Sequence, residues 1–409
     1  MSVDLARLKD IVVDEVDSLR ERITEVSETI HANPELGLKE YKASELLSSE
    51  LRSHGFDVQR GIAALETAFK ASFTMGRGGP HIAFLAEYDA LPEIGHGCGH
   101  NIIGASAIFS AIALSKLSER LNGKVTIFGT PDEEGSGGKI PIIRAGFFDD
   151  VDAAIMTHPW DTTSAWMPSV ALASLTIDFT GRGAHYSAPH KGVNALDGVV
   201  LTLAALNGLR HGFRNDVIYG YTIDQGGVIP SIIPEKASAR LWVKSTDLRN
   251  LTDVVNRVKA CAEGIANSMG ARVDVYHHYP LFEESIPNLT LIRKVSGNFS
   301  RLGMVYEAPE KTSRSLVYTS TDYGNASHVV PSASPSIAIG PDGLAAHTKE
   351  FAEAAVSKTA HEALLGITKV MAMTGIDLLG EMGVLEEAKA EFSSYRASGF
   401  SKVPFAPTY

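Results

Sequence analysis

Two hydrophobic patterns alternate along the first part of the chain, up to about residue 165. Short apolar runs rich in β-branched residues are typical of buried strands, and stretches with an apolar residue every three or four positions are typical of amphipathic helices. Their alternation predicts an α/β domain with a central sheet flanked by helices. The predicted elements are helices over residues 4–30, 40–54 and 102–121, and strands over residues 56–62, 68–74, 81–88, 124–130 and 153–158.

A second unit interrupts this pattern between residues 170 and 284. Its predicted strands cover residues 171–181, 216–224, 236–244 and 271–280, and its predicted helices cover residues 194–212 and 251–270. The order of these elements is that of a ferredoxin-like α+β layer. We therefore expect one domain built from residues 1–169 and 285–409, with residues 170–284 inserted into it.

The first domain resumes after the insertion. The predicted elements are a helix over residues 288–302, a strand over 334–341 and a helix over 348–375, and no periodicity is evident from about Ser393. In the inserted layer, the first helix carries an apolar stripe, and we expect the layer to form an interface with another copy through its helices; the alternative is that the stripe covers the layer's own sheet. The stripe consists of Val199, Val200, Leu203 and Leu206.

Side chains that bind metal ions follow several of the apolar runs. Ligands of α/β sheets gather at the carboxyl ends of the strands, so we expect these side chains to converge in space. Their donors are thiolate sulfur, imidazole nitrogen and carboxylate oxygen, which suit zinc, manganese, cobalt or nickel and are poor for calcium or magnesium. The side chains are Cys98, His100, Glu133, Glu134, His158 and His347.

The size of this set indicates more than one ion. Five protein ligands are too many for one tetrahedral ion, but two ions about 3.5–4 Å apart would use them all if one ligand bridged the pair. One of the adjacent Glu133 and Glu134 would then bind metal, while the other serves as general base to a metal-bound water. His96 is either a loop histidine or a residue that orients a ligand.

Charge and cysteine content restrict the possible partners. The net charge of −11 argues against a nucleic-acid or anionic-membrane surface and favours a small-molecule substrate. The N-terminal segment has helical spacing without an uninterrupted apolar core, and no stretch of about 18 apolar residues lacks charge, so neither a signal peptide nor a membrane span is expected. If Cys98 binds metal, only Cys261 remains and no disulfide forms, which fits the cytoplasm.

Several motifs in order now make the chain recognisable. They are HANPELGLKE, EYDALPEIGHGCGHN, the paired glutamates, THP, GRGAHYSAPHKGVNALD, GGVIPSIIPE, STDYGNASHVVP and AAHTKEF. Together they resemble the M20 metallopeptidase family, and most closely its branch of aminobenzoyl-glutamate hydrolases and M20 domain-containing dipeptidases. The resemblance implies a catalytic domain with a central mixed sheet, an inserted ferredoxin-like lid and dimerisation domain, and a hydrolase of C–N bonds.

The resemblance also implies a cofactor and roles for individual residues. The cofactor is two divalent transition-metal ions, zinc or manganese, with cobalt or nickel as alternatives. Glu133 corresponds to the general base, and Asp89, two residues beyond Glu87, corresponds to a carboxylate that orients a ligand. The implied metal ligands are Cys98, His100, Glu134, His158 and His347.

In the inserted domain, the resemblance implies a homodimer or a larger homo-oligomer. His185 matches a histidine that polarises the scissile carbonyl, often in the partner's active site, and Asn194 lies in the same motif. Two substrate-binding positions differ from the family pattern: Ser231 stands where relatives usually have Asn, and Lys244 where they commonly have Arg. Lysine lacks the bidentate fork of arginine, so we expect carboxylate recognition to be altered.

The expected function is hydrolysis of an amide in a small acidic or aromatic substrate, such as an N-acyl or aminoacyl amino acid. The two substitutions predict poor activity on ordinary dipeptides and aminobenzoyl-glutamate, and better activity on a compact acyl or aromatic substrate with one acidic group. One alternative is hydrolytic deamination of an aromatic amine at the same metal site. Another is a non-catalytic metal-binding homologue, against which the presence of Glu133 argues.

Overall fold

The computed structural model describes residues 4–308, 311 and 318–399, which form two compact units. Within these ranges, the first unit contains residues 4–168, 285–308, 311 and 325–399, and the second contains residues 169–284 and 318–324. The grouping of residues 318–324 with the second unit differs from the expected boundaries. A hydrogen bond between distant segments of the chain contributes to this grouping, because the amide of Val170 donates to the carbonyl of Thr319 at 2.8 Å.

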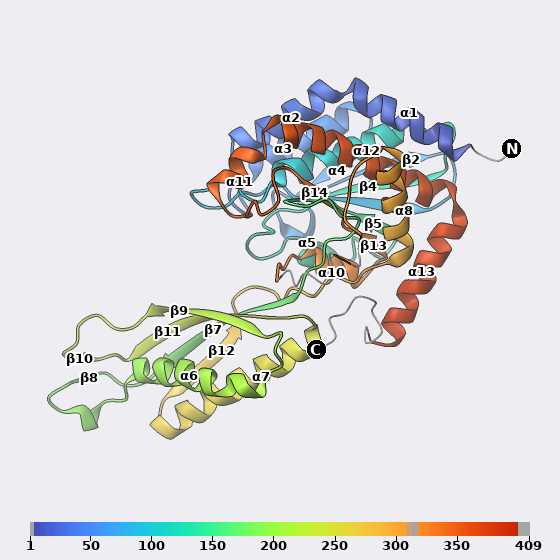
Figure 1. Ribbon diagram of the computed structural model, residues 1–409. Coiled ribbons are helices and arrows are strands. Elements are labelled where there is room, and N and C mark those ends of the chain that lie inside the picture. Colours follow the sequence, from blue (N-terminus) through green and yellow to red (C-terminus); the bar gives the residue numbers. More distant parts are fainter. Residues whose placement is uncertain (1–3, 309–310, 312–317, 400–409) are drawn as a thin grey trace. The chain divides into compact units, whose positions relative to one another are not determined.

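The first unit is built on a mixed six-stranded sheet, as predicted (Figure 1). The strand order is β1-β2-β4-β3-β5-β13, in which β3, β4, β5 and β13 are parallel neighbours, whereas β2 is antiparallel to β1 and β4. The loops that follow the parallel strands therefore open at the same edge of the sheet. The strands are β1 (Asp57–Arg60), β2 (Phe69–Met75), β3 (His81–Ala86), β4 (Gly123–Gly129), β5 (Ala153–Ile155) and β13 (Ser332–Ala333).

A parallel pair, β6 (His158–Trp160) and β14 (Ser336–Ala338), continues beyond β5 and β13. Helices surround this framework, and α4 is buried at every position because its sequence is apolar on all sides. The helices are α1 (Leu5–Ser18), α2 (Arg20–Ala32), α3 (Tyr41–Ser53), α4 (His100–Ser115), α5 (Lys139–Arg144), α8 (Leu289–Arg301), α10 (Tyr323–Ser327), α11 (Lys349–Ala354), α12 (Lys358–Gly380) and α13 (Met382–Ala397).

Three helix predictions were wrong in detail. The helix predicted over residues 102–121 ends at Ser115. The helix predicted over residues 4–30 is divided at Leu19, which ends α1 and precedes α2. The helix predicted over residues 348–375 is divided into α11 and α12. Where no periodicity was recognised after Ser393, α13 continues to Ala397, and Tyr395 is buried.

One helix has the length and composition of a membrane span. α12 is long and apolar enough to cross a membrane, but 83% of its most apolar stretch is buried inside the structure. It packs against α1, α4 and α8, so its apolar residues are accounted for by the core of the first unit.

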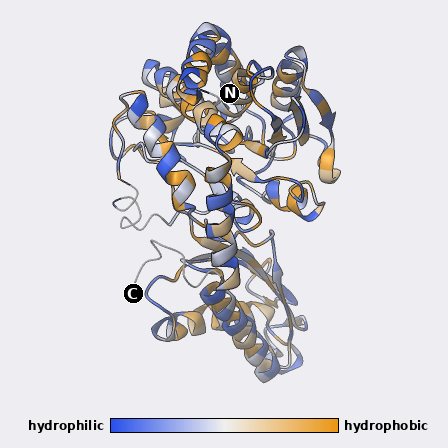
Figure 2. Ribbon diagram, turned by 90° about the vertical axis from the view of Figure 1, so that its right-hand side faces the viewer, coloured by the Kyte–Doolittle hydropathy of each residue, from blue (hydrophilic) through white to orange (hydrophobic). Residues whose placement is uncertain are grey.

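The second unit has the predicted ferredoxin-like order. Its antiparallel sheet has the strand order β12-β7-β11-β9, and α6 and α7 pack on this sheet (Figure 1). The elements are β7 (Ala171–Thr180), α6 (Ala195–Leu209), β9 (Ile218–Gln225), β11 (Lys236–Ser245), α7 (Leu248–Met269) and β12 (Arg272–His277). Figure 2 shows hydrophilic and hydrophobic residues mixed along the helices of the structure, and α7 buries one face through Leu251, Val254, Val258 and Ala262.

The apolar stripe of α6 belongs to the core of this unit. Val199, Leu203 and Leu206 are buried in it, and Val200 is exposed. The stripe therefore covers the layer's own sheet, which was the second of its two expected uses.

Candidate metal centre

The predicted ligands lie in loops and at element ends on the edge where the parallel strands finish. Cys98 lies two residues before His100, where α4 begins. Gly99, between them, has a φ of 74°. A Cβ at Gly99 would stand 2.9 Å from Cγ of Pro159, so only glycine fits this turn without displacing its neighbour. His158 is the first residue of β6 and is buried.

The other two ligand loops are also held in unusual backbone conformations. His347 has a φ of 63°, and its amide donates to the carbonyl of Gly97 at 2.8 Å, which joins its loop to that of Cys98. Asp132, just before the paired glutamates, has a φ of 58°. A left-handed conformation is uncommon for residues other than glycine and is often found at functional sites.

The structure brings all five predicted ligands together. The donor atoms of Cys98, His100 and His158 lie within 4.8 Å of one another, and so do those of Cys98, Glu134 and His347. Cys98 belongs to both groups, so its sulfur lies where a ligand shared by two ions is needed. Within the groups, Cys98 Sγ is 3.5 Å from His158 Nε2, and His347 Nε2 is 3.1 Å from Glu134 Oε1.

Asp89 orients two parts of this cluster. Its Oδ1 accepts a hydrogen bond from His100 Nδ1 at 2.8 Å, and its Oδ2 accepts one from the amide of Glu134 at 3.0 Å. Because Nδ1 of His100 donates to Asp89, Nε2 is left with its lone pair directed into the cluster. Among the described residues, this Nε2 has no hydrogen-bond partner. His158 is oriented in the same way, since its Nδ1 donates to the carbonyl of Pro159 at 2.6 Å.

The electrostatics of the cluster favour a bound cation. Burial raises the pKa of the Cys98 thiol, so a thiolate at this position requires positive charge beside it. Burial alone would lower the pKa of His100, but Asp89 and Cys98 raise it well above its usual value. Burial lowers the pKa of His158, which keeps its imidazole neutral and available as a ligand. The donor set therefore fits divalent transition-metal ions.

Both paired glutamates approach His100. Glu133 Oε2 is 3.8 Å and Glu134 Oε1 is 4.0 Å from His100 Nε2, and Glu133 is buried. Glu134 Oε1 also contacts His347 Nε2 at 3.1 Å. Their proximity to the same nitrogen means that the division of roles between them stays a prediction.

His96 lies outside the ligand groups. Its Nε2 donates to the carbonyl of Ile30 at 3.1 Å, and its ring lies 5.9 Å from that of His31. Burial lowers the pKa of His96 to about 3, so the ring is neutral. The hydrogen bond attaches the loop before Cys98 to α2.

Two buried acids near the site were missed from the sequence. Glu87 forms an ion pair with Lys139 at 2.5 Å, and both side chains are fully buried. Oε1 of Glu40 accepts hydrogen bonds from the amides of Leu38 and Asp132, each at 2.9 Å, and thereby holds the backbone before Glu133. Burial raises the pKa of Glu40 to about 7. In the sequence, Glu87 could have been found only from its position two residues before Asp89. Nothing in the sequence pointed to Glu40 except that it lies in the motif HANPELGLKE.

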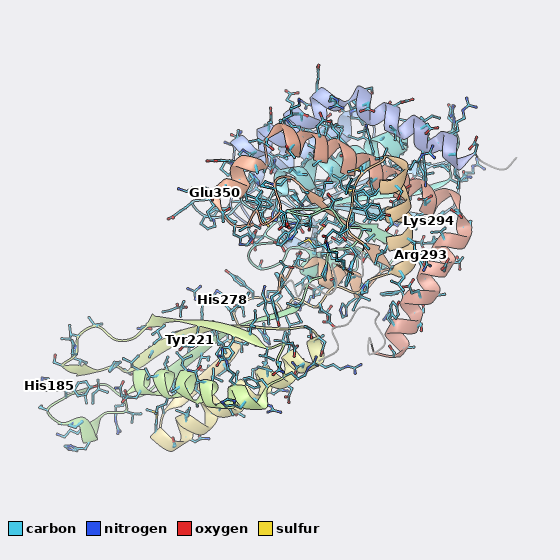
Figure 3. The ribbon with its side chains drawn as sticks, in the orientation of Figure 1. His185, Tyr221, His278, Arg293, Lys294 and Glu350 are labelled. Atoms are coloured by element: carbon cyan, nitrogen blue, oxygen red, sulfur yellow. The ribbon has the colours of Figure 1, made fainter. Side chains whose placement is uncertain are left out.

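Three of the predicted residues of the second unit lie at one end of it. His185, labelled in Figure 3, is on β8 (Ala184–His185). This strand pairs with β10 (Ile232–Ile233) in the register His185 to Ile232. Ser231 directly precedes β10, and its carbonyl accepts from the amide of Tyr186 at 3.1 Å. Asn194 caps α6 through the amide of Leu196 and donates to the Tyr186 hydroxyl at 3.2 Å.

The hydrogen bonds of His185 define which of its nitrogens carries a proton. The amide of Ser187 donates to Nδ1 at 3.1 Å, so Nδ1 is an acceptor and Nε2 carries the hydrogen in the neutral ring. The side chain is exposed, which leaves this N–H available as a donor. Beside it, a cavity of about 390 Å³ is lined mainly by apolar residues and glycines of the 226–234 segment.

Lys244 does not lie with these three residues. It is eight positions beyond Lys236, where β11 begins, which is roughly 26 Å along an extended strand. Its side chain is buried, with the ammonium group 4.2 Å from the centroid of the Trp242 ring and donating to the carbonyl of Tyr318.

The chain matches known proteins along nearly its whole length. The model of the family described as Peptidase family M20/M25/M40 matches residues 83–369. The Xaa-Arg dipeptidase of Mus musculus is 33% identical over 405 residues, which cover 96% of this chain and 93% of the relative. The chain belongs to peptidase family M20/M25/M40. Another relative of this M20 protein, a subunit of p-aminobenzoyl-glutamate hydrolase from Escherichia coli (strain K12), is 29% identical over 92% of this chain and 93% of its own.

Solved structures share the fold. A dinuclear metal binding peptidase from M20 family of Bacillus subtilis covers 89% of this chain and 99% of its own, with a TM-score of 0.67 and 19% identity. An aminobenzoyl-glutamate utilization protein from Klebsiella pneumoniae covers 90% and 97%, with a TM-score of 0.70 and 16% identity. The resemblance drawn from the motifs is confirmed, and this M20 protein is a metal-dependent hydrolase of C–N bonds.

Proposed function

We propose that this M20 protein is a binuclear amidohydrolase of small N-acyl or aminoacyl amino acids. The observation that carries the proposal is that the two ligand groups share Cys98. Cys98, His100 and His158 would hold one ion, and Cys98, Glu134 and His347 would hold the other. The mixed sulfur, nitrogen and oxygen donors favour zinc or manganese, with cobalt or nickel as alternatives.

Bound divalent ions polarise a carbonyl and make water nucleophilic at neutral pH. The residues around them divide the remaining work. Glu133 takes a proton from the attacking water and delivers it to the leaving nitrogen, for which it lies close enough to the ligand cluster. Asp89 keeps His100 in the orientation and tautomer of a ligand. His185 donates its Nε2 hydrogen to the carbonyl oxygen as negative charge develops there.

The two cysteines fit a reducing compartment, and we place the protein in the cytoplasm. Cys98 and Cys261 are both free thiols. A ligand thiol that had to compete with oxidation would lose its metal, so a compartment in which thiols stay reduced supports the site.

The substrate prediction rests on Ser231 and Lys244. The ammonium group of Lys244 already interacts with Tyr318 and Trp242, so a substrate carboxylate must share it with them. We expect purified, metal-loaded protein to hydrolyse compact N-acyl amino acids with one acidic group better than p-aminobenzoyl-glutamate, Xaa-Arg dipeptides or ordinary dipeptides. Steady-state kinetics on this panel measure the difference. A kcat/KM of about 10⁴ M⁻¹s⁻¹ or more on p-aminobenzoyl-glutamate would show that this predicted substrate preference is wrong.

The same panel separates amide hydrolysis from deamination. Hydrolysis of an amide releases two organic fragments, whereas deamination of an arylamine releases ammonia and one organic product. Quantifying ammonia and both fragments by mass spectrometry therefore decides between them. Ammonia without a second fragment would replace the amidohydrolase proposal by the deaminase alternative.

We further propose a homodimer in which His185 acts in the partner's site. His185 pairs with Ile232 of β10, which precedes the start of β11, whereas Lys244 lies near the other end of β11, so one compact substrate does not reach both within a single copy. The end that carries His185 also exposes apolar side chains, with Val228 96% exposed and Ile229 and Ile232 about half exposed. Contiguous exposed apolar residues are typical of an interface.

Mixing two inactive variants tests this arrangement. A mixture of His185→Ala and Glu133→Gln protomers is expected to regain part of the activity, because a mixed dimer contains one site with both residues intact. Each variant incubated alone is the control, and co-purification of differently tagged protomers demonstrates subunit exchange. Exchange without any recovery would place His185 in the active site of its own chain.

A further inference from the structure

The buried carboxylate of Glu87 faces the metal-binding nitrogen of His100. Its Oε2 lies 3.4 Å from His100 Nε2, and both side chains are fully buried. Among the described residues, neither of these two atoms has a hydrogen-bond partner. Because His100 Nδ1 donates to Asp89, Nε2 can present its lone pair to a cation, and Glu87 Oε2 lies directly beside it. A buried carboxylate oxygen and an imidazole nitrogen this close need positive charge between them, which is either a proton on Nε2 or a cation bound to both atoms.

The separation of the two atoms is that of two ligands on one ion. Bonds from zinc to nitrogen and oxygen are about 2.0–2.2 Å long, so two such donors on a tetrahedral ion stand about 3.4 Å apart. The donor atoms of Glu87, His100 and Glu133 also lie within 4.8 Å of one another. An ion on Nε2 of His100 is therefore within reach of Glu87.

Lys139 holds Glu87 in this position. Its ammonium donates to Oε1 of Glu87 at 2.5 Å, which engages one carboxylate oxygen and leaves the other directed at His100. Lys139 is the first residue of α5, shortly after the paired glutamates, whereas Glu87 directly follows β3. The ion pair therefore joins the end of β3 to the start of α5 and supplies the counter-charge that a buried carboxylate needs.

The geometry points to Glu87 as a further carboxylate of the metal centre, which contributes an oxygen to the ion bound by His100, with Lys139 as its buried counter-ion. This inference rests on the proposed binuclear site. The Glu87 carboxylate would raise the affinity for the ion bound by His100 above that given by the other ligands alone.

Metal binding by Glu87→Gln tests the inference without reference to activity. The amide keeps the shape of the side chain but loses the charge, so one of the two ions is expected to bind at least about tenfold more weakly. Equilibrium dialysis against buffered free Zn²⁺ or Mn²⁺, followed by elemental analysis, measures both affinities. Thermal unfolding of the metal-free protein shows whether the variant is folded.

A second variant covers the case in which the lone Lys139 charge prevents folding. In Glu87→Met/Lys139→Met, both charges are replaced by apolar groups of similar size, which is often tolerated. The matched control is Lys9→Met/Asp377→Met, which removes another ion pair of the first unit, at 2.6 Å, between α1 and α12. The Glu87 double variant is expected to lose at least about tenfold in affinity for one ion, and the control to keep wild-type affinities.

The outcomes separate this inference from the proposed function. A folded Glu87 variant that binds two ions with wild-type affinity would overturn the role of Glu87 alone. Wild-type protein that binds no divalent ion would overturn the proposed binuclear site, and the inference with it.

Discussion

Removing divalent metal abolishes the hydrolase activity, and adding Mn²⁺, Co²⁺ or Zn²⁺ restores it. We expect this result because the site concentrates a thiol, buried carboxylates and imidazoles whose lone pairs converge. Without cations, Glu133 has no activated water to deprotonate. Prolonged dialysis against a chelator, followed by activity assays and elemental analysis before and after metal addition, measures the effect.

The two cysteines provide a matched pair of variants for this experiment. Cys98→Ala removes the ligand shared by both groups and is expected to lose both ions and all activity. Cys261→Ala, on α7 of the second unit, is expected to keep metal content and turnover. Full turnover by metal-free wild-type protein would contradict the central chemistry of the site, and equal loss of metal in the two variants would contradict the role of Cys98.

Replacing Glu133 by Gln lowers kcat about 10²–10⁴-fold while metal content stays at the wild-type level. Glu134→Gln loses metal affinity as well, because Glu134 contacts His347 within the second ligand group. Both glutamates lie about equally far from His100, so geometry alone does not separate their roles. Steady-state kinetics and elemental analysis of both variants separate the two roles.

A comparison of the two variants under the same metal supply is the internal control. Excess metal is expected to rescue part of the activity of Glu134→Gln and none of that of Glu133→Gln. Equal metal loss in both variants, or rescue of both, would show that the two carboxylates share the ligand role.

The order of strands and helices and most of the site residues were accessible from the sequence. The apolar run of β3 and the amphipathic spacing of α7 are local signals, and each is set by neighbouring residues whose burial follows directly from their spacing. The candidate ligands were identifiable because Cys98 and His158 follow strand-like runs, and strand ends are where ligands gather.

Other features depend on residues that are far apart in the chain. The break at Leu19 lies between two stretches with the same helical spacing, so no local signal distinguishes it from a continuous helix. Residues 318–324 group with the second unit through hydrogen bonds such as that between Val170 and Thr319. Spacing within a segment carries no information on such contacts.

Sequence alone was sufficient to predict an α/β hydrolase with an inserted ferredoxin-like layer and a metal site of mixed donors, because hydrophobic periodicity and donor chemistry are properties of single residues and their neighbours. Only the tertiary structure decided that Cys98 belongs to two ligand groups, that Asp89 joins His100 to the Glu134 loop, and that Glu87 and Lys139 pair beside them. These are distances between atoms on different strands and loops, and they come into existence only when the parallel strands pack side by side.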